Sequence, residues 1–123
     1  MTVEEAITCA DELEPNQYSC RQKKCWLTQL DGRIFDELLK GRPDCAVTDY
    51  PVYTAQTQTL LVPAPYAWSI YTAYLQAMIA LENAETVRYS QQMLMFNTAY
   101  SEYSNYVNRI MSPRSPAQNR IRF

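Results

Sequence analysis

The segment from residue 89 to residue 110 constrains the fold most, because its apolar side chains recur at alternating intervals of four and three residues. These side chains belong to Tyr89, Met93, Phe96, Tyr100, Tyr103, Val107 and Ile110. Such a seam is typical of a helix that packs along one stripe. The opposite face is polar and carries Gln91, Thr98, Ser101, Asn105 and Asn108. The pattern predicts a helix that covers a core from one side, and tyrosine at this spacing indicates a core or an interface rather than a cofactor site.

The helical pattern is longer than this segment and extends from Pro65 to about Met111. As a single rod it would span about 70 Å at ~1.5 Å per residue, which is too long for a small domain. Asn83 is the predicted hinge, because asparagine can end one helix or cap the next. We therefore expect an antiparallel helical hairpin over residues 66–110. Its first arm carries two apolar seams and should be buried on two sides.

Two helices are expected before the hairpin. Thr2 and Glu5 form a capping box, and apolar residues then recur at helical spacing until Pro15. A second helix begins shortly afterwards and continues to Lys40. Together with the hairpin, this gives about four helices over roughly 60% of the chain, well above the usual helical share. The predicted class is all-α, as a single domain over residues 1–112.

A long connection separates the two helical parts. Residues 43–65 contain four of the seven prolines and several threonines, which favour an extended backbone. We expect an extended loop, and one short strand or hairpin within it is an open alternative. Loops of this length are typically functional or ordered by a partner. The uncharged residues 51–62 are predicted to be ordered mainly by neighbouring subunits, with partner contacts from Tyr53, Leu60 and Leu61.

The C-terminal residues 113–123 are predicted to form an extended basic tail without an acidic residue. The residues expected to bind a partner are Arg114, Arg120, Ile121, Arg122 and Phe123. A basic arm with an apolar end can dock into an acidic, partly apolar groove on a partner. A frayed terminus without a role is the alternative.

The chain lacks most of the groups that enzymes use. It has no histidine and two glycines, so neither Ser-His or Cys-His pairs nor glycine-rich phosphate loops can form. The four cysteines contain no Cys-x-x-Cys pair and are expected to be free thiols, so neither a metal nor a cofactor is predicted. Two carboxylate pairs, Glu82 with Glu85 and Asp36 with Glu37, fit a solvated helix face. We predict a non-enzymatic protein.

Charge and hydropathy limit the kinds of partner that the protein is expected to bind. The net charge of -2 argues against strong overall attraction to nucleic acid or an acidic membrane. Residues 51–81 carry no charge, but prolines leave a helical part of roughly sixteen residues, below the ~20 that a span needs. We therefore expect no membrane contact. The basic cluster from Arg21 to Lys24, followed by Trp26, supports an alternative function as a small helical regulatory or nucleic-acid-binding protein.

A set of residues across the chain carries a resemblance to a known family. They are Leu61 to Tyr66, Tyr74, Leu75, Ala77, Ile79, Asn83, Glu85, Tyr89, Met93, Met95, Phe96, Asn97, Ala99, Tyr100, Tyr106, Asn108 and Arg109, and, more loosely, the T-V-x-E-A opening and Trp26 to Arg33. With them the chain resembles small proteins of tailed bacteriophages and prophages that are regarded as head-tail connector or adaptor proteins. Ala84 stands where such sequences are expected to have a glycine.

The resemblance implies a virion structural protein that is made in the bacterial cytoplasm. Its implied partners are copies of itself, in a homo-oligomeric ring, and the portal protein and tail-side proteins between which the ring lies. DNA would pass through the channel of the ring without sequence-specific binding. A portal or capsid gene beside this one would favour the connector interpretation, whereas a repressor or toxin gene would favour the regulatory alternative.

Overall fold

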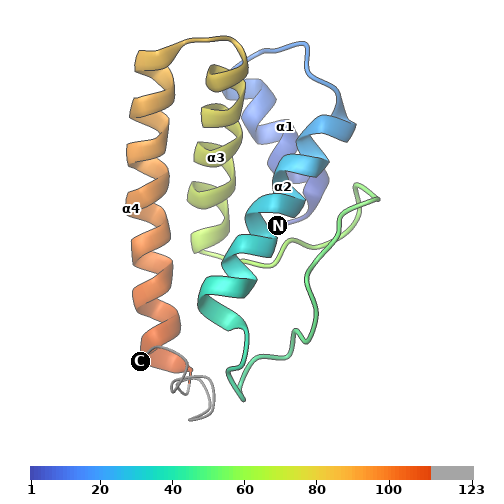
Figure 1. Cartoon of the computed structure of the whole chain (residues 1–123). Helices are drawn as coiled ribbons and strands as arrows, with labels where there is room; N and C mark the ends of the chain where they lie inside the picture. Colours follow the sequence, from blue (N-terminus) through green and yellow to red (C-terminus); the bar gives the residue numbers. More distant parts are fainter. Residues whose placement is uncertain (112–123) are drawn as a thin grey trace.

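The computed structural model describes residues 1–111, and within them the architecture is all-α (Figure 1). The helices are α1 (Val3–Leu13), α2 (Cys20–Ile34), α3 (Tyr66–Glu82) and α4 (Thr86–Ile110). A π-helical turn, η1 (Phe35–Leu39), continues α2 directly. The predicted all-α class is confirmed. The second predicted helix thus reaches almost to Lys40, with a wider last turn than the pattern indicated.

Helix α3 lies at the centre of the bundle. α4 runs beside it in the opposite direction, and α1 and α2 pack on its other side (Figure 1). Its buried residues are Ala67, Ile70, Tyr71, Thr72, Ala73, Leu75, Ala77, Ile79 and Ala80. They are spread around most of the helix rather than along one stripe, because neighbours cover it on two sides. This is the arrangement that its two apolar seams predicted.

The apolar seam of α4 faces α3 and forms part of the core. Phe96, Tyr103 and Val107 are buried. The ring centroids of Tyr74 and Phe96 lie 5.4 Å apart, a separation at which tilted aromatic rings attract each other. The seam leaves the core at both ends, because Tyr89 is half-buried outside the core cluster and Ile110 is 53% exposed. The aromatic seam is therefore mainly a core element.

The turn between α3 and α4 falls at the predicted hinge. Asn83 caps α3, and Ala84 adopts a φ of 59°, in the left-handed region that favours glycine. The N–H of Glu85 donates to the carbonyl oxygen of Ala80 at 2.9 Å. The hydroxyl of Tyr18 donates to Asn83 Oδ1 at 2.5 Å, which ties the turn to the segment before α2. The position where the resemblance expects glycine is thus one that glycine would suit.

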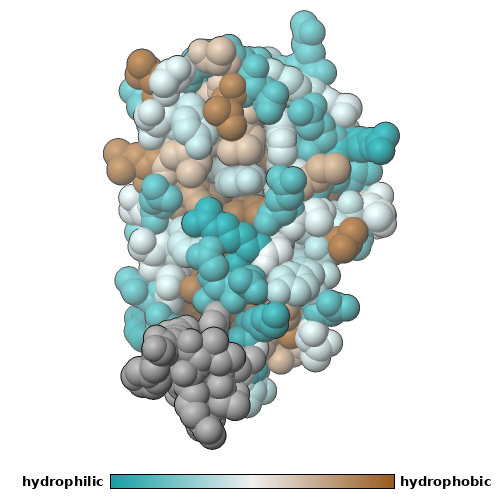
Figure 2. Space-filling view, in the orientation of Figure 1, coloured by the Kyte–Doolittle hydropathy of each residue, from teal (hydrophilic) through white to brown (hydrophobic). Residues whose placement is uncertain are grey.

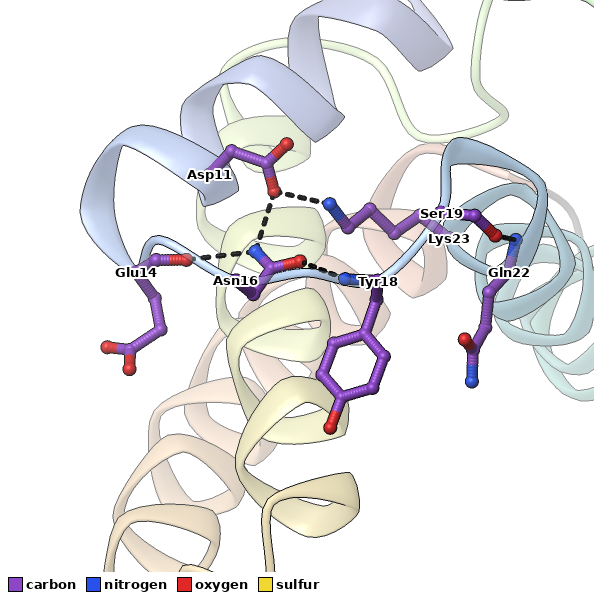
Figure 3. A network of polar contacts seen from close by, with 7 residues as sticks. All are labelled: Asp11, Glu14, Asn16, Tyr18, Ser19, Gln22 and Lys23. Carbon is purple, nitrogen blue, oxygen red and sulfur yellow. Dashed lines mark hydrogen bonds and ion pairs between the residues drawn. The ribbon is translucent and has the colours of Figure 1, made fainter.

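A polar network joins α1 to α2 (Figure 3). The Lys23 ammonium group, only 3% exposed, pairs with Asp11 at 2.7 Å. Asn16 Nδ2 donates to the same carboxylate at 2.9 Å and to the carbonyl oxygen of Glu14 at 3.0 Å. Asn16 Oδ1 accepts the N–H of Tyr18 at 3.1 Å. Because a buried charge needs a partner, these contacts fix the path of the connection between the two helices.

The extended loop, residues 43–65, runs along the bundle and covers the start of α1 (Figure 1). The N–H of Val3 donates to the carbonyl oxygen of Gln58, and that of Glu4 to Gln56, each at 2.9 Å. The first N–H groups of a helix have no partner within the helix itself. The loop supplies the missing acceptors and thereby caps α1.

The sequence left open whether residues 43–65 contain a short strand. The structure has one isolated antiparallel bridge there. It joins Thr2 to Thr59, and no strand forms within residues 1–111. The N–H of Leu60 also donates to the carbonyl oxygen of Met1 at 2.9 Å. Residues 51–62 therefore make backbone contacts with the start of their own chain, and ordering by neighbouring subunits stays a prediction.

Candidate interaction surface

The loop residues predicted to contact a partner lie in or near the core. Tyr53 is 7% exposed and Leu60 is 4% exposed, and Leu61 is half-buried against the same core. Their side chains pack against this chain and present little surface to another one. Tyr53 and Leu60 thus anchor the loop to its own bundle, and their role in binding a partner stays a prediction.

A buried carboxylate holds the loop in place. Asp31 of α2 is fully buried and accepts hydrogen bonds from the hydroxyl of Tyr53, from the hydroxyl of Tyr71 at 2.7 Å and from the N–H of Leu61 at 3.1 Å. The Tyr71 hydroxyl in turn accepts the N–H of Val62 at 2.8 Å. These bonds connect the loop to both α2 and α3.

The electrostatics of this cluster suit a structural role. Burial raises the pKa of Asp31, although the hydrogen bonds from Tyr53, Tyr71 and Leu61 act in the opposite direction. Burial, and then the Asp31 carboxylate, raise the pKa of Tyr71 well above its ordinary value. No atom of Asp31 is accessible, so a dissolved substrate cannot reach its carboxylate. Sequence reasoning missed this anchor; its one signal was a lone acid among the apolar residues of a helix.

Two residues of the basic cluster before Trp26 make contacts within the folded chain. Lys23 is buried in its pair with Asp11. Lys24 donates to the carbonyl oxygen of Thr54 in the loop at 3.3 Å, and Arg21 is exposed. The cluster therefore offers less positive charge at the surface than its sequence indicated.

The predicted tail contacts, Arg114, Arg120, Ile121, Arg122 and Phe123, lie outside the described residues. They stay predictions.

An open apolar groove of about 620 Å³ runs between α3 and α4 on the side where α1 ends. We call it the α3–α4 groove. From α1 and α3 it is lined by Leu13, Trp68, Ser69, Thr72, Ala73 and Gln76. From α4 it is lined by Gln92, Leu94, Met95, Thr98, Ala99 and Glu102.

The groove forms because small residues make its floor and large ones its walls. Ala73 and Ala99 are buried between the two helices and leave room above them. Trp68 is 52% exposed, Leu94 is 69% exposed and Met95 is 60% exposed. Figure 2 shows one face of the molecule, on which apolar side chains lie among hydrophilic ones. Contiguous exposed apolar surface on a small protein typically marks an interaction site.

Two polar groups give the groove a chemical preference. Gln92 Oε1 is buried and has no hydrogen-bond partner within the described residues, so it can accept a bond from an incoming donor. Glu102 is the one charged residue among those that line the groove in the described part of the chain. The groove therefore favours a ligand that is apolar, carries hydrogen-bond donors and is positively charged at one side.

Other kinds of site lack support in the described part of the chain. Residues 1–111 contain no group of three potential metal ligands. Within the same residues, no helix combines the length and the apolar character that crossing a membrane requires. No protein-family model, curated protein or solved structure matches this chain.

The sequence did not predict the groove, because the apolar seams of the two hairpin helices do not include its exposed residues. Trp68, Leu94 and Met95 are apolar residues that fall beside the helical seams rather than on them. The seams place these side chains on no predicted surface, and the pattern predicts a polar outer side for α4. Large apolar residues adjacent to an otherwise polar face were the available signal.

Proposed function

We propose that this protein is a non-enzymatic structural subunit of tailed-phage or prophage particles, a head-tail connector that assembles with copies of itself between the portal and the tail. The observation that carries the proposal is the α3–α4 groove. Most of the aromatic seam of α4 packs in the core, yet Trp68, Leu94 and Met95 remain exposed beside it. A chain of this size gains nothing in stability from such residues outside its core, so their use is expected to be contact with other molecules.

A second exposed apolar set supports assembly into a ring. Val47, Tyr50 and Val52 of the extended loop are 37%, 45% and 61% exposed. The loop lies along α2, on the side of the bundle away from α4 (Figure 1). Contact between two different faces of identical subunits is heterologous, and heterologous contacts generate rings when the rotation closes. Hydrogen bonds to Asp31 and Tyr71 attach the loop to the bundle.

The proposal is tested by charging the groove without touching the core. The double variant Leu94→Asp with Met95→Asp is expected to fold, as judged by circular dichroism, and to lose incorporation into particles and self-association measured by native mass spectrometry. The matched control is Val87→Asp, which changes a residue of α4 that is 73% exposed and does not line the groove. The control is expected to assemble normally. Normal assembly of the groove variant would contradict the proposal.

A further inference from the structure

The α3–α4 groove continues toward the C-terminal end of α4. A second, shallower depression is lined by Tyr66, Glu102, Asn105 and Arg109. Glu102 lines both depressions, so together they form one path along the hairpin. The path begins near the last turn of α4, where residue 112 follows, and ends between Trp68 and the exposed residues of α4.

The chain beyond residue 111 has the length to follow this path. Along α4, the 15 residues from Met95 to Ile110 span about 22 Å at ~1.5 Å per residue. Ile121 lies 11 residues beyond Ile110, and an extended chain of that length reaches about 36 Å. The excess of about 14 Å leaves room for the reversal of direction that the path requires.

The composition of the tail matches the groove. Ile121 and Phe123 are apolar, and three arginines accompany them without an acidic residue. Glu102 makes no ion pair or side-chain hydrogen bond within the described residues, and it faces the path at its middle. An extended segment also brings backbone N–H groups and guanidinium donors to the unpartnered Gln92 Oε1.

We propose that residues 112–123 fold back along α4 and place Ile121 and Phe123 in the α3–α4 groove of the same chain, with the arginines toward Glu102. An attached segment has an effective concentration in the millimolar range, so even a weak apolar anchor occupies a site on its own chain. The tail then covers the groove in the free subunit. Only the consequence for assembly, in which a neighbouring subunit displaces the tail, rests on the proposed function.

Fluorescence of Trp68 tests the docking in the full-length protein. The chain has two tryptophans, and Trp26 is 7% exposed whereas Trp68 lines the groove. Subtracting the signal of Trp68→Phe isolates the Trp68 emission without altering the core around Trp26. In the wild type, Trp68 is expected to be shielded from acrylamide. In Ile121→Ser with Phe123→Ser, its quenching constant is expected to rise about twofold, with emission shifted to longer wavelength, as the ring regains water contact.

The matched control is Arg21→Ser with Val87→Ser, which changes one exposed basic and one exposed apolar residue that line neither depression, and keeps the proposed anchors. It is expected to leave the Trp68 quenching near the wild-type value. Equal quenching in the wild type and in the Ile121/Phe123 variant would overturn the proposal. So would shielding that disappears on hundredfold dilution together with loss of dimers, because that result places the tail in the groove of another copy.

The docking and the proposed function fail in different ways. If the tail covers the groove, the Ile121/Phe123 variant shows more accessible Trp68 whether or not the protein assembles. If the groove is a subunit contact, the Leu94/Met95 variant loses assembly whatever the quenching shows. Weaker self-association of the Ile121/Phe123 variant than of the wild type would also overturn the covering role, because an uncovered groove should associate at least as strongly.

Discussion

The two sides of α4 use similar residues for opposite purposes. Toward α3, Phe96, Tyr103 and Val107 are fully enclosed, whereas Leu94 and Met95 on the flank are mostly exposed. The inner side contributes to the free energy of folding, because its apolar area leaves water when the chain folds. The flank contributes little until another segment covers it. Hydrophobicity alone therefore does not separate stabilising residues from binding residues on this helix.

The largest expected effect comes from the inner side. Phe96→Ala should lower the free energy of unfolding by about 3 to 5 kcal/mol, because it leaves a cavity in a closed part of the core. Urea denaturation with the linear extrapolation measures the change. A loss below about 1 kcal/mol would place Phe96 outside the core and would erase the contrast between the two sides.

Two methionines sharpen the comparison with the same side chain. Met93 is half-buried against the core, and Met95 is 60% exposed in the groove wall. Met93→Ala should cost about 1 to 2 kcal/mol of unfolding free energy, and Met95→Ala less than about 0.5 kcal/mol. Parallel urea titrations give both values. Equal losses of unfolding free energy at the two positions would contradict the difference between the inner side and the flank of α4.

High pH probes the inner side through its tyrosines. Burial, and then the nearby Asp31 carboxylate, raise the pKa of Tyr103 from 10.0 to about 12. Between these values the unfolded chain releases the phenolic proton before the folded chain does, so stability that is present below pH 10 is lost as the pH rises toward 12. Wild type should lose about 1 to 2 kcal/mol more than Tyr103→Phe across this interval. Parallel loss in both proteins would show that Tyr103 titrates normally.

The turn between α3 and α4 lies on neither side of α4, and a substitution there should have a small, stabilising effect. Ala84→Gly removes a Cβ from a residue with a φ of 59° and should raise the free energy of unfolding by about 0.5 to 1 kcal/mol. Thermal denaturation measures the gain, and Ala80→Gly, within α3, serves as the control that should destabilise. A destabilising Ala84→Gly would indicate that the left-handed turn is not formed in solution.

The α-helices and the turn were predictable because their signals are local. The Thr2 capping box, the stop before Pro15 and the hinge at Asn83 each depend on a few neighbouring residues, and the structure has helix ends at Leu13, Glu82 and Thr86. The π-helical turn was not predictable in this way. It depends on the N–H of Lys40 reaching the carbonyl oxygen of Phe35, five residues earlier, and no residue type specifies that spacing.

The candidate site was less predictable, because exposure is decided by segments that are distant in sequence. Tyr53 and Leu60 look like loop surface, yet the Asp31 carboxylate and the Tyr71 hydroxyl draw that loop onto the bundle. The groove is equally non-local, because its lining combines Trp68 and Ala73 of α3 with Ala99 of α4.

The sequence by itself determined that the chain is all-α, where its long hairpin turns and which stripe of α4 faces inward. These features follow from helical periodicity and from capping, both of which act within a few residues. The tertiary structure alone decided that Tyr53 is an anchor and that Leu94 and Met95 form a wall of an open groove. Burial depends on which surfaces meet, and a core of limited size covers only some of the apolar residues that a sequence offers.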